Sequence, residues 1–71
     1  MKIEVLNAGH EYIVLVDGHE SRLRVNGPLV VGEVFWKENG KKRHFTLKAF
    51  PISMVDVLQR RIEIEIAKKH R

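Results

Sequence analysis

Basic and aromatic side chains are concentrated between Phe35 and Lys48, in a segment whose chemistry suits an anionic ligand. Five cationic residues and one acidic residue lie between Lys37 and Lys48, so this stretch carries a net charge of +4, equal to the formal net charge of the whole chain. The remaining residues therefore sum to zero charge. Charge that is concentrated on one rigid element steers anionic partners, whereas scattered charge mainly maintains solubility.

The residue types in this segment are those that bind nucleic acid. Lysines neutralise phosphates and release counterions, and an aromatic ring offers a stacking plane to a base. The expected contact residues are Phe35, Lys37, Lys41, Lys42, Arg43, His44 and Lys48. We expect recognition to be largely independent of base sequence, because the chain has no recognition-helix motif and no RNP signature. The alternative is a solvated hairpin whose lysines protect a sheet edge from aggregation.

An Asn39-Gly40 pair between the two arms is a strong signal for a two-residue hairpin turn. The register that follows from such a turn predicts two faces. On one face the expected partners are Trp36–Arg43, Val34–Phe45 and Gly32–Leu47, and on the other they are Lys37–Lys42, Phe35–His44, Glu33–Thr46 and Val31–Lys48. Two lysines directly opposite each other destabilise a sheet, so their presence is easier to explain if an anion lies between them.

A protein-interaction module, such as an accessory subunit or a small inhibitor of a larger complex, is the second functional hypothesis. Val57 and Ile64 lie away from the main apolar stripe of the C-terminal segment. They either fill a wide groove or mark a contact with another subunit, which includes a second copy of this chain. Trp36, the single tryptophan, is interpreted mainly as a core residue and otherwise as a partner contact.

The first half of the chain has the pattern of three strands. Ile3 and Val5 alternate with charged residues, which predicts a strand at about residues 2–7. Residues 12–16 are continuously apolar, as in a strand covered on both faces. Asp17-Gly18 predicts a second two-residue turn, whose register places Glu11 opposite Arg24. A break at residues 26–28, which includes Pro28, precedes a strand at about residues 29–37.

The C-terminal segment has two interpretations. As a helix from Ser53 to Arg71, it places one apolar stripe on the sheet, with Ser53 as a candidate cap. As a strand, residues 62–66 alternate strictly between Ile and Glu. Residues 52–59 would then be a short helix that leads into the last strand of a small β-barrel. We favour the helix because Gln, Arg, Glu, Ala and Lys are good helix formers.

The composition argues against several other functions. The 71 residues contain no cysteine, and the four histidines have no spacing typical of a metal site, so we expect no metal and no cofactor. No glycine-rich phosphate loop or activated nucleophile stands out, so we expect no enzymatic activity. The longest apolar run is too short to span a membrane, and we expect a cytoplasmic protein. A charged fraction of 31% without cysteine leans toward the composition of thermophile proteins.

The sequence thus predicts one small basic domain over residues 1–71, of the α+β class. The expected architecture is an antiparallel meander of four or five strands with an amphipathic C-terminal helix across one face. The predicted core contains Ile3, Val5, Val14, Leu23, Val34, Phe45, Leu47, Val55, Leu58 and Ile62.

Overall fold

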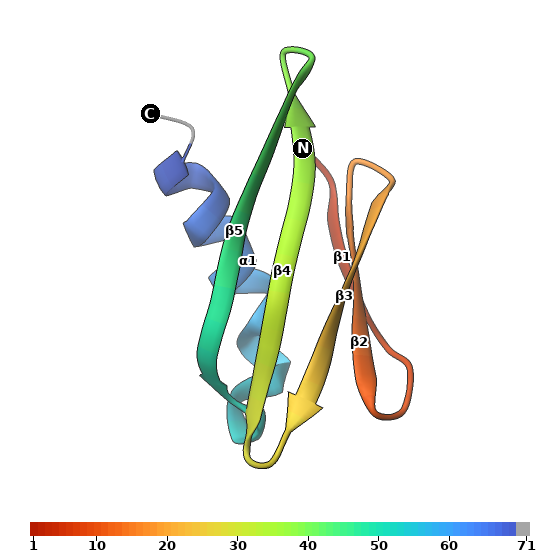
Figure 1. The fold of residues 1–71 in the computed structure, drawn as a ribbon, viewed down its shortest axis with the longest axis vertical. Helices are drawn as coiled ribbons and strands as arrows, with labels where there is room; N and C mark the ends of the chain where they lie inside the picture. Colours follow the sequence, from red (N-terminus) through yellow and green to blue (C-terminus); the bar gives the residue numbers. More distant parts are fainter. Residues whose placement is uncertain (70–71) are drawn as a thin grey trace.

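The computed structural model describes residues 1–69 and contains a five-stranded antiparallel sheet followed by a helical segment (Figure 1). The elements are β1 (Ile3–Asn7), β2 (Glu11–Val16), β3 (His19–Asn26), β4 (Leu29–Glu38), β5 (Lys41–Pro51), the 3₁₀ helix η1 (Ile52–Val57) and α1 (Leu58–Lys69). The strand order β1-β2-β3-β4-β5 leaves β1 and β5 as open edges. The predicted α+β meander is therefore confirmed, and the barrel with a final strand is wrong.

The two predicted hairpin registers are confirmed. Asp17 and Asn39 adopt positive φ angles of 50° and 53°, as a type I′ turn requires, and each is followed by a glycine that is also in this region. The ladder places Glu11 opposite Arg24 and Lys37 opposite Lys42. The one exception is the expected pair of Val31 and Lys48, because the register of β4 and β5 shifts at a β-bulge between Val30 and Gly32.

The helical segment covers one face of the sheet, and the core lies between them (Figure 1). The buried apolar residues are Tyr12, Val14, Val16, Leu23, Val30, Val34, Trp36, Phe45, Leu47, Phe50, Leu58, Ile62 and Ile66. Three predicted core residues, Ile3, Val5 and Val55, are only partly buried at its margin. The expectation that β2 is covered on both faces is wrong, since Ile13 and Leu15 on its second face remain half-buried.

The C-terminal segment forms two helices within the described residues, with non-helical backbone at Met54, and it starts differently from the prediction. It begins after Pro51 with the six-residue 3₁₀ helix η1, which has no side-chain capping bond, so the expected cap by Ser53 is wrong. Within α1, Leu58, Ile62 and Ile66 are buried at helical spacing, whereas Ile64 is 42% exposed. The predicted helix end at His70 and Arg71 lies outside the described residues. Within residues 1–69, no helix is long and apolar enough to span a membrane.

Strands β3 and β4 are paired along only part of their length. Their ladder runs from Asn26–Leu29 to Leu23–Gly32 and stops there, although both strands continue. Figure 1 shows β3 diverging from β4 toward the β2–β3 turn. In the diverging part, the backbone N–H of Phe35 donates a 2.9 Å hydrogen bond to the Ser21 hydroxyl oxygen. A side chain therefore takes over the role that a neighbouring backbone carbonyl has in a regular ladder.

The divergence begins at Gly32. This residue has φ +147°, a conformation that L side chains rarely adopt, and it adjoins the register shift between β4 and β5. A Cβ atom at this position would lie 2.9 Å from Leu23 Cδ2 and 3.1 Å from the Arg22 carbonyl oxygen. Gly32 thus allows β3 to approach β4 closely at the point where the two strands separate.

Ser21 is buried, with 4% of its surface exposed, and removal of its hydroxyl group would leave the Phe35 N–H without its hydrogen-bond acceptor. We expect Ser21→Ala to lower the free energy of unfolding by about 1–3 kcal/mol, because the Phe35 N–H would lose its partner in a partly buried place. Urea denaturation of both proteins measures this change. Ser53→Ala is the matched control, since Ser53 is exposed and makes no capping bond. Equal effects of the two substitutions would contradict the role given to Ser21.

Candidate nucleic-acid interface

An aromatic pair is exposed on the face of the sheet that the helix leaves open. Phe35 on β4 is 47% exposed and lies opposite His44 on β5. Their ring centroids are 5.8 Å apart, with an interplanar angle of 38°. Side chains alternate between the two faces of a strand, so the burial of Val34 and Trp36 leaves Phe35 on the open side. The pair therefore forms a partly apolar platform of two tilted rings that is accessible to a ligand.

Three lysines lie on the same face as this platform. Lys37 and Lys42 are directly opposite each other in the ladder, and Lys48 is further along β5, beside the bulge. All three are exposed, and none of them makes an ion pair with another residue in the part of the chain that the structure describes. Net positive charge thus flanks the aromatic pair along about 20 Å of strand, at roughly 3.3 Å per residue, although the Glu33 carboxylate lies on the same face.

Two basic residues of the predicted set lie elsewhere. Arg43 is on the helix-covered face, where its guanidinium donates a hydrogen bond to the Lys69 carbonyl at the end of α1. Lys41 shares the face of Arg43, opposite Glu38 at the tip of the hairpin. The prediction therefore overestimated the number of cationic side chains on the aromatic face. Lys41 and Arg43 lie on the other face of the hairpin. The aromatic face carries Phe35, Lys37, Lys42, His44 and Lys48.

The candidate protein contacts differ from one another in exposure. Trp36 is 2% exposed and its ring packs against Phe45, with the centroids 6.0 Å apart, so it belongs to the core. Val57 and Ile64 are 43% and 42% exposed. They do not fill a groove of this domain, and the first of the two explanations offered for them is wrong.

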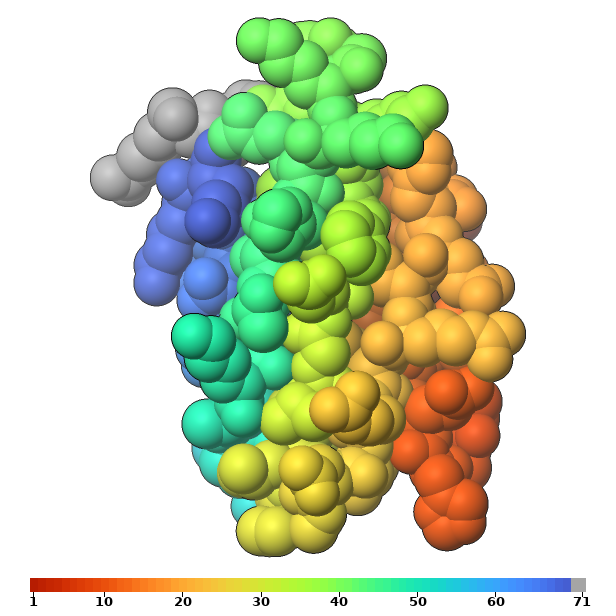
Figure 2. Space-filling view, in the orientation of Figure 1, coloured from red at the N-terminus to blue at the C-terminus, as the bar shows by residue number. Residues whose placement is uncertain are grey.

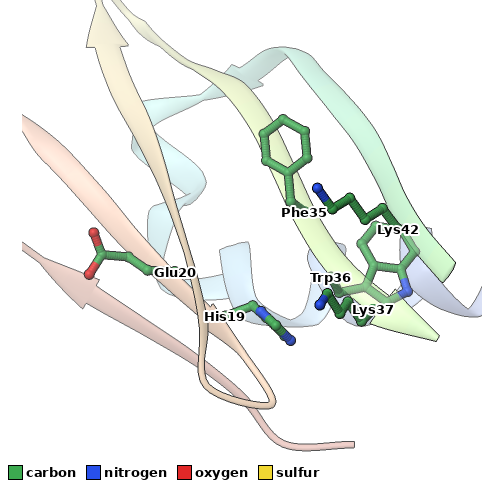
Figure 3. A pocket seen from close by; sticks show the side chains of 6 residues that line it. All are labelled: His19, Glu20, Phe35, Trp36, Lys37 and Lys42. Atoms are coloured by element: carbon green, nitrogen blue, oxygen red, sulfur yellow. The ribbon is translucent and has the colours of Figure 1, made fainter. Parts of the chain in front are cut away.

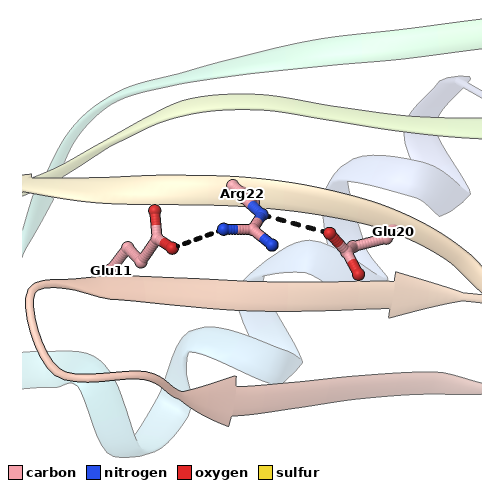
Figure 4. A network of polar contacts seen from close by, with 3 residues as sticks. All are labelled: Glu11, Glu20 and Arg22. Carbon is pink, nitrogen blue, oxygen red and sulfur yellow. Dashed lines mark hydrogen bonds and ion pairs between the residues drawn. The ribbon is translucent and has the colours of Figure 1, made fainter.

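The charges on the β2–β3 part of the open face are largely paired. Arg22 contacts Glu11 at 2.8 Å and Glu20 at 3.1 Å, and it joins the two strands in a three-membered network (Figure 4). The hydrogen bond with Glu20 and the negative charge of Glu11 raise the pKa of Arg22 above its usual value. Glu11 therefore meets Arg22 diagonally, although Arg24 is its partner in the ladder.

The positive field of the open face consequently lies over β4 and β5. Figure 2 views the molecule from this side, where the green β4–β5 hairpin stands clear of the neighbouring strands at its tip and the blue helix lies behind it. An anionic ligand that approaches this face meets the three lysines and the Glu33 carboxylate on the β4–β5 half, and largely paired charges on the other half. This asymmetry favours binding along the hairpin.

Sequence reasoning missed two residues of β3, His19 and Glu20. Together with residues of β4 and β5, they line a pocket where β3 and β4 separate. The two hairpin registers could be deduced from their turns, but the end of the β3–β4 ladder has no signal in either turn. The one feature of the sequence that could have indicated this irregularity is Gly32 within an apolar strand, because an isolated strand glycine often marks a bulge.

Within residues 1–69, no group of three or more histidine, aspartate or glutamate side chains comes together in an arrangement that could hold a metal ion. No protein-family model, no curated protein sequence and no solved structure matches this chain significantly.

Proposed function

We propose that this chain is a non-enzymatic nucleic-acid-binding protein that uses the open face of the β4–β5 hairpin. The observation that carries the proposal is the combination of an exposed aromatic pair, Phe35 and His44, with three lysines that have no ion-pair partner in the described residues. Lys37, Lys42 and Lys48 contact phosphates, and Phe35 stacks on a base. Electrostatic contacts supply the affinity and the ring supplies a sequence-tolerant platform.

A single strand fits this surface better than a duplex. The bases of a single strand are free to stack on Phe35, whereas those of a duplex are already stacked on one another. The exposed ring would be unused if only duplex phosphates were bound. The surface also has few side chains placed to read base edges, which supports binding that depends little on sequence.

The dependence of binding on salt tests the proposal. Three lysine–phosphate contacts predict a slope of about −2 for log affinity against log salt on single-stranded DNA, which is roughly a 20-fold loss between about 50 and 200 mM. Fluorescence anisotropy of a labelled mixed-sequence strand measures this slope. Lys48→Gln should reduce its magnitude by about 0.7, because one phosphate contact is removed.

Lys68→Gln is the matched control for Lys48→Gln. It removes the same charge from α1, on the other side of the sheet, where Lys68 lies 3.7 Å from Glu65. This variant should retain the slope of the parent protein. The absence of binding at low salt, or equal effects of the two variants, would refute the proposed interface.

A protein-interaction role is the second candidate, and the exposure of Val57 and Ile64 is the observation that favours it. Exposed apolar side chains on the helical layer suit a partner with an apolar contact surface. Such binding should change little with salt. Ile64→Glu should abolish it and leave the affinity for a single strand unchanged, so this variant separates the two functions.

A further inference from the structure

A pocket opens where β3 and β4 separate, close to the aromatic platform. It has a volume of about 240 Å³ and is lined by His19, Glu20, Phe35, Trp36, Lys37 and Lys42 (Figure 3). Its walls thus come from β3 on one side and from the β4–β5 hairpin on the other. The lack of ladder pairs beyond Leu23–Gly32 creates this space between two strands that are neighbours in the sheet.

Nitrogen groups converge on the pocket from both walls. Figure 3 shows the ammonium groups of Lys37 and Lys42 extending from the hairpin toward the space between β4 and β3. The imidazole of His19 extends toward them from β3. The carboxylate of Glu20 points away, and it is held by Arg22 at 3.1 Å. The one acidic side chain of the lining is therefore neutralised elsewhere, which leaves a cationic pocket.

The backbone adds a further donor. Along a strand, the N–H groups of alternate residues point to the same side. The N–H of Phe35 is directed toward β3, where it binds the Ser21 hydroxyl, so the N–H of Lys37 is directed to the same side, beyond the end of the ladder. A backbone N–H beside two ammonium groups is a typical arrangement for binding an anion.

We propose that this pocket binds a phosphate group of a nucleotide, held by Lys37, Lys42 and His19, with the attached base on Phe35. The inference deepens the proposed function and rests on it. It also explains why two lysines face each other across the β4–β5 ladder, since a phosphate between them converts a repulsion into two charge-assisted contacts. The phosphate is either an internal phosphodiester or a terminal monoester.

An extended peptide strand is the competing occupant, because the pocket borders backbone groups outside the ladder. The charges favour phosphate. A peptide that pairs with β3 and β4 would satisfy their backbone groups, but it would leave the two ammonium groups and the imidazole without an anion. Phosphate is the occupant that uses both the side chains and the Lys37 N–H.

Titration of the ¹⁵N-labelled full chain with adenosine 5′-monophosphate tests the inference by NMR. We expect shifts at the amides of His19 and Lys37 and at the indole N–H of Trp36, which is the only indole in the chain and lines the pocket. Inorganic phosphate should move the same amides, and adenosine, which lacks the phosphate, should not. Lys42→Gln should weaken adenosine monophosphate binding about tenfold, as expected for the loss of a charged contact.

Lys41→Gln is the matched control, because it removes the same charge from the next residue, on the other face of the hairpin. Its affinity for adenosine monophosphate should stay within about twofold of the parent, since a solvated charge at that distance is screened. The phosphate inference is overturned if phosphate and adenosine monophosphate leave the pocket resonances unmoved, or if the two variants behave alike. Unmoved resonances would leave an extended peptide as the occupant.

Oligonucleotides with and without a 5′-phosphate distinguish the two phosphate sources and separate this inference from the proposed function. Equal affinities with equal shifts at His19 identify an internal phosphodiester, and tighter binding of the phosphorylated strand identifies a terminal monoester. If single strands bind with the expected salt slope but the pocket resonances do not move, the function stands and the pocket assignment falls. If adenosine monophosphate moves them while no strand binds, the pocket binds phosphate and the proposed function falls.

Discussion

Gly32→Ala is expected to lower the free energy of unfolding by about 2–6 kcal/mol. The φ angle of +147° is strained for alanine, and the new Cβ would lie 2.9 Å from Leu23 Cδ2 and close to the backbone of β3. Backbone strain and overpacking each cost about 1–3 kcal/mol. Because small domains have only about 5–15 kcal/mol of stability in total, the variant should be detectably unfolded at moderate urea. Urea and thermal denaturation measure the loss.

Gly9→Ala separates the two causes. Gly9 also has a positive φ, +81°, but an added Cβ would have no neighbour within 4 Å. Alanine at this position should therefore cost only the backbone term, about 1 kcal/mol. If Gly32→Ala were no more destabilising than Gly9→Ala, the close approach of β3 to β4 would not be the reason for glycine at position 32.

Lys42→Glu is expected to weaken single-strand binding about 30-fold at low salt and at the same time to stabilise the free protein. Loss of a phosphate contact and the new repulsion are each on the order of 1 kcal/mol at a solvated surface. In the free protein, the substitution replaces two opposed lysines by a Lys37–Glu pair across the ladder, which should add about 0.2–1 kcal/mol. Anisotropy and urea denaturation of the same samples measure both changes.

Lys48→Glu is the matched control, because Lys48 lies beside the bulge and has no lysine directly opposite in the ladder. It should weaken binding without the gain in stability. A loss of stability in Lys42→Glu would indicate that Lys42 serves the fold. The contrasting changes in binding and stability would instead identify Lys42 as a residue that costs the free protein some stability and benefits the complex.

The sequence determines the placement of the aromatic pair and the opposed lysines because both hairpins close on two-residue turns. Asp17-Gly18 and Asn39-Gly40 each impose one register, and the register then places Phe35 with His44 and Lys37 with Lys42. The open sheet and its order follow from the succession of short turns. These features are local, so residue patterns within about ten positions are sufficient to predict them.

The features that the sequence did not reveal depend on contacts between separate elements. The hydrogen bond from Arg43 to the Lys69 carbonyl depends on where α1 lies on the sheet, and no pattern within the strands specifies that position. The start of the helical segment at a 3₁₀ turn reflects Pro51, which fixes the backbone before Ser53 has a role as a cap. The separation of β3 from β4 begins at Gly32, where β3 and β4 approach each other closely, and such a contact between strands depends on non-local packing.

The short ladder between β3 and β4 also marks a boundary between two ribbons of the sheet. On one side of it β1–β3 form a three-stranded ribbon, and on the other the β4–β5 hairpin forms a second ribbon that continues into α1. Near the hairpin tip, the Phe35–Ser21 hydrogen bond connects the ribbons where ladder pairs are missing. A ligand held between the ribbons would connect them along the part of the sheet where this hydrogen bond otherwise does so, and its binding would thus replace missing ladder pairs.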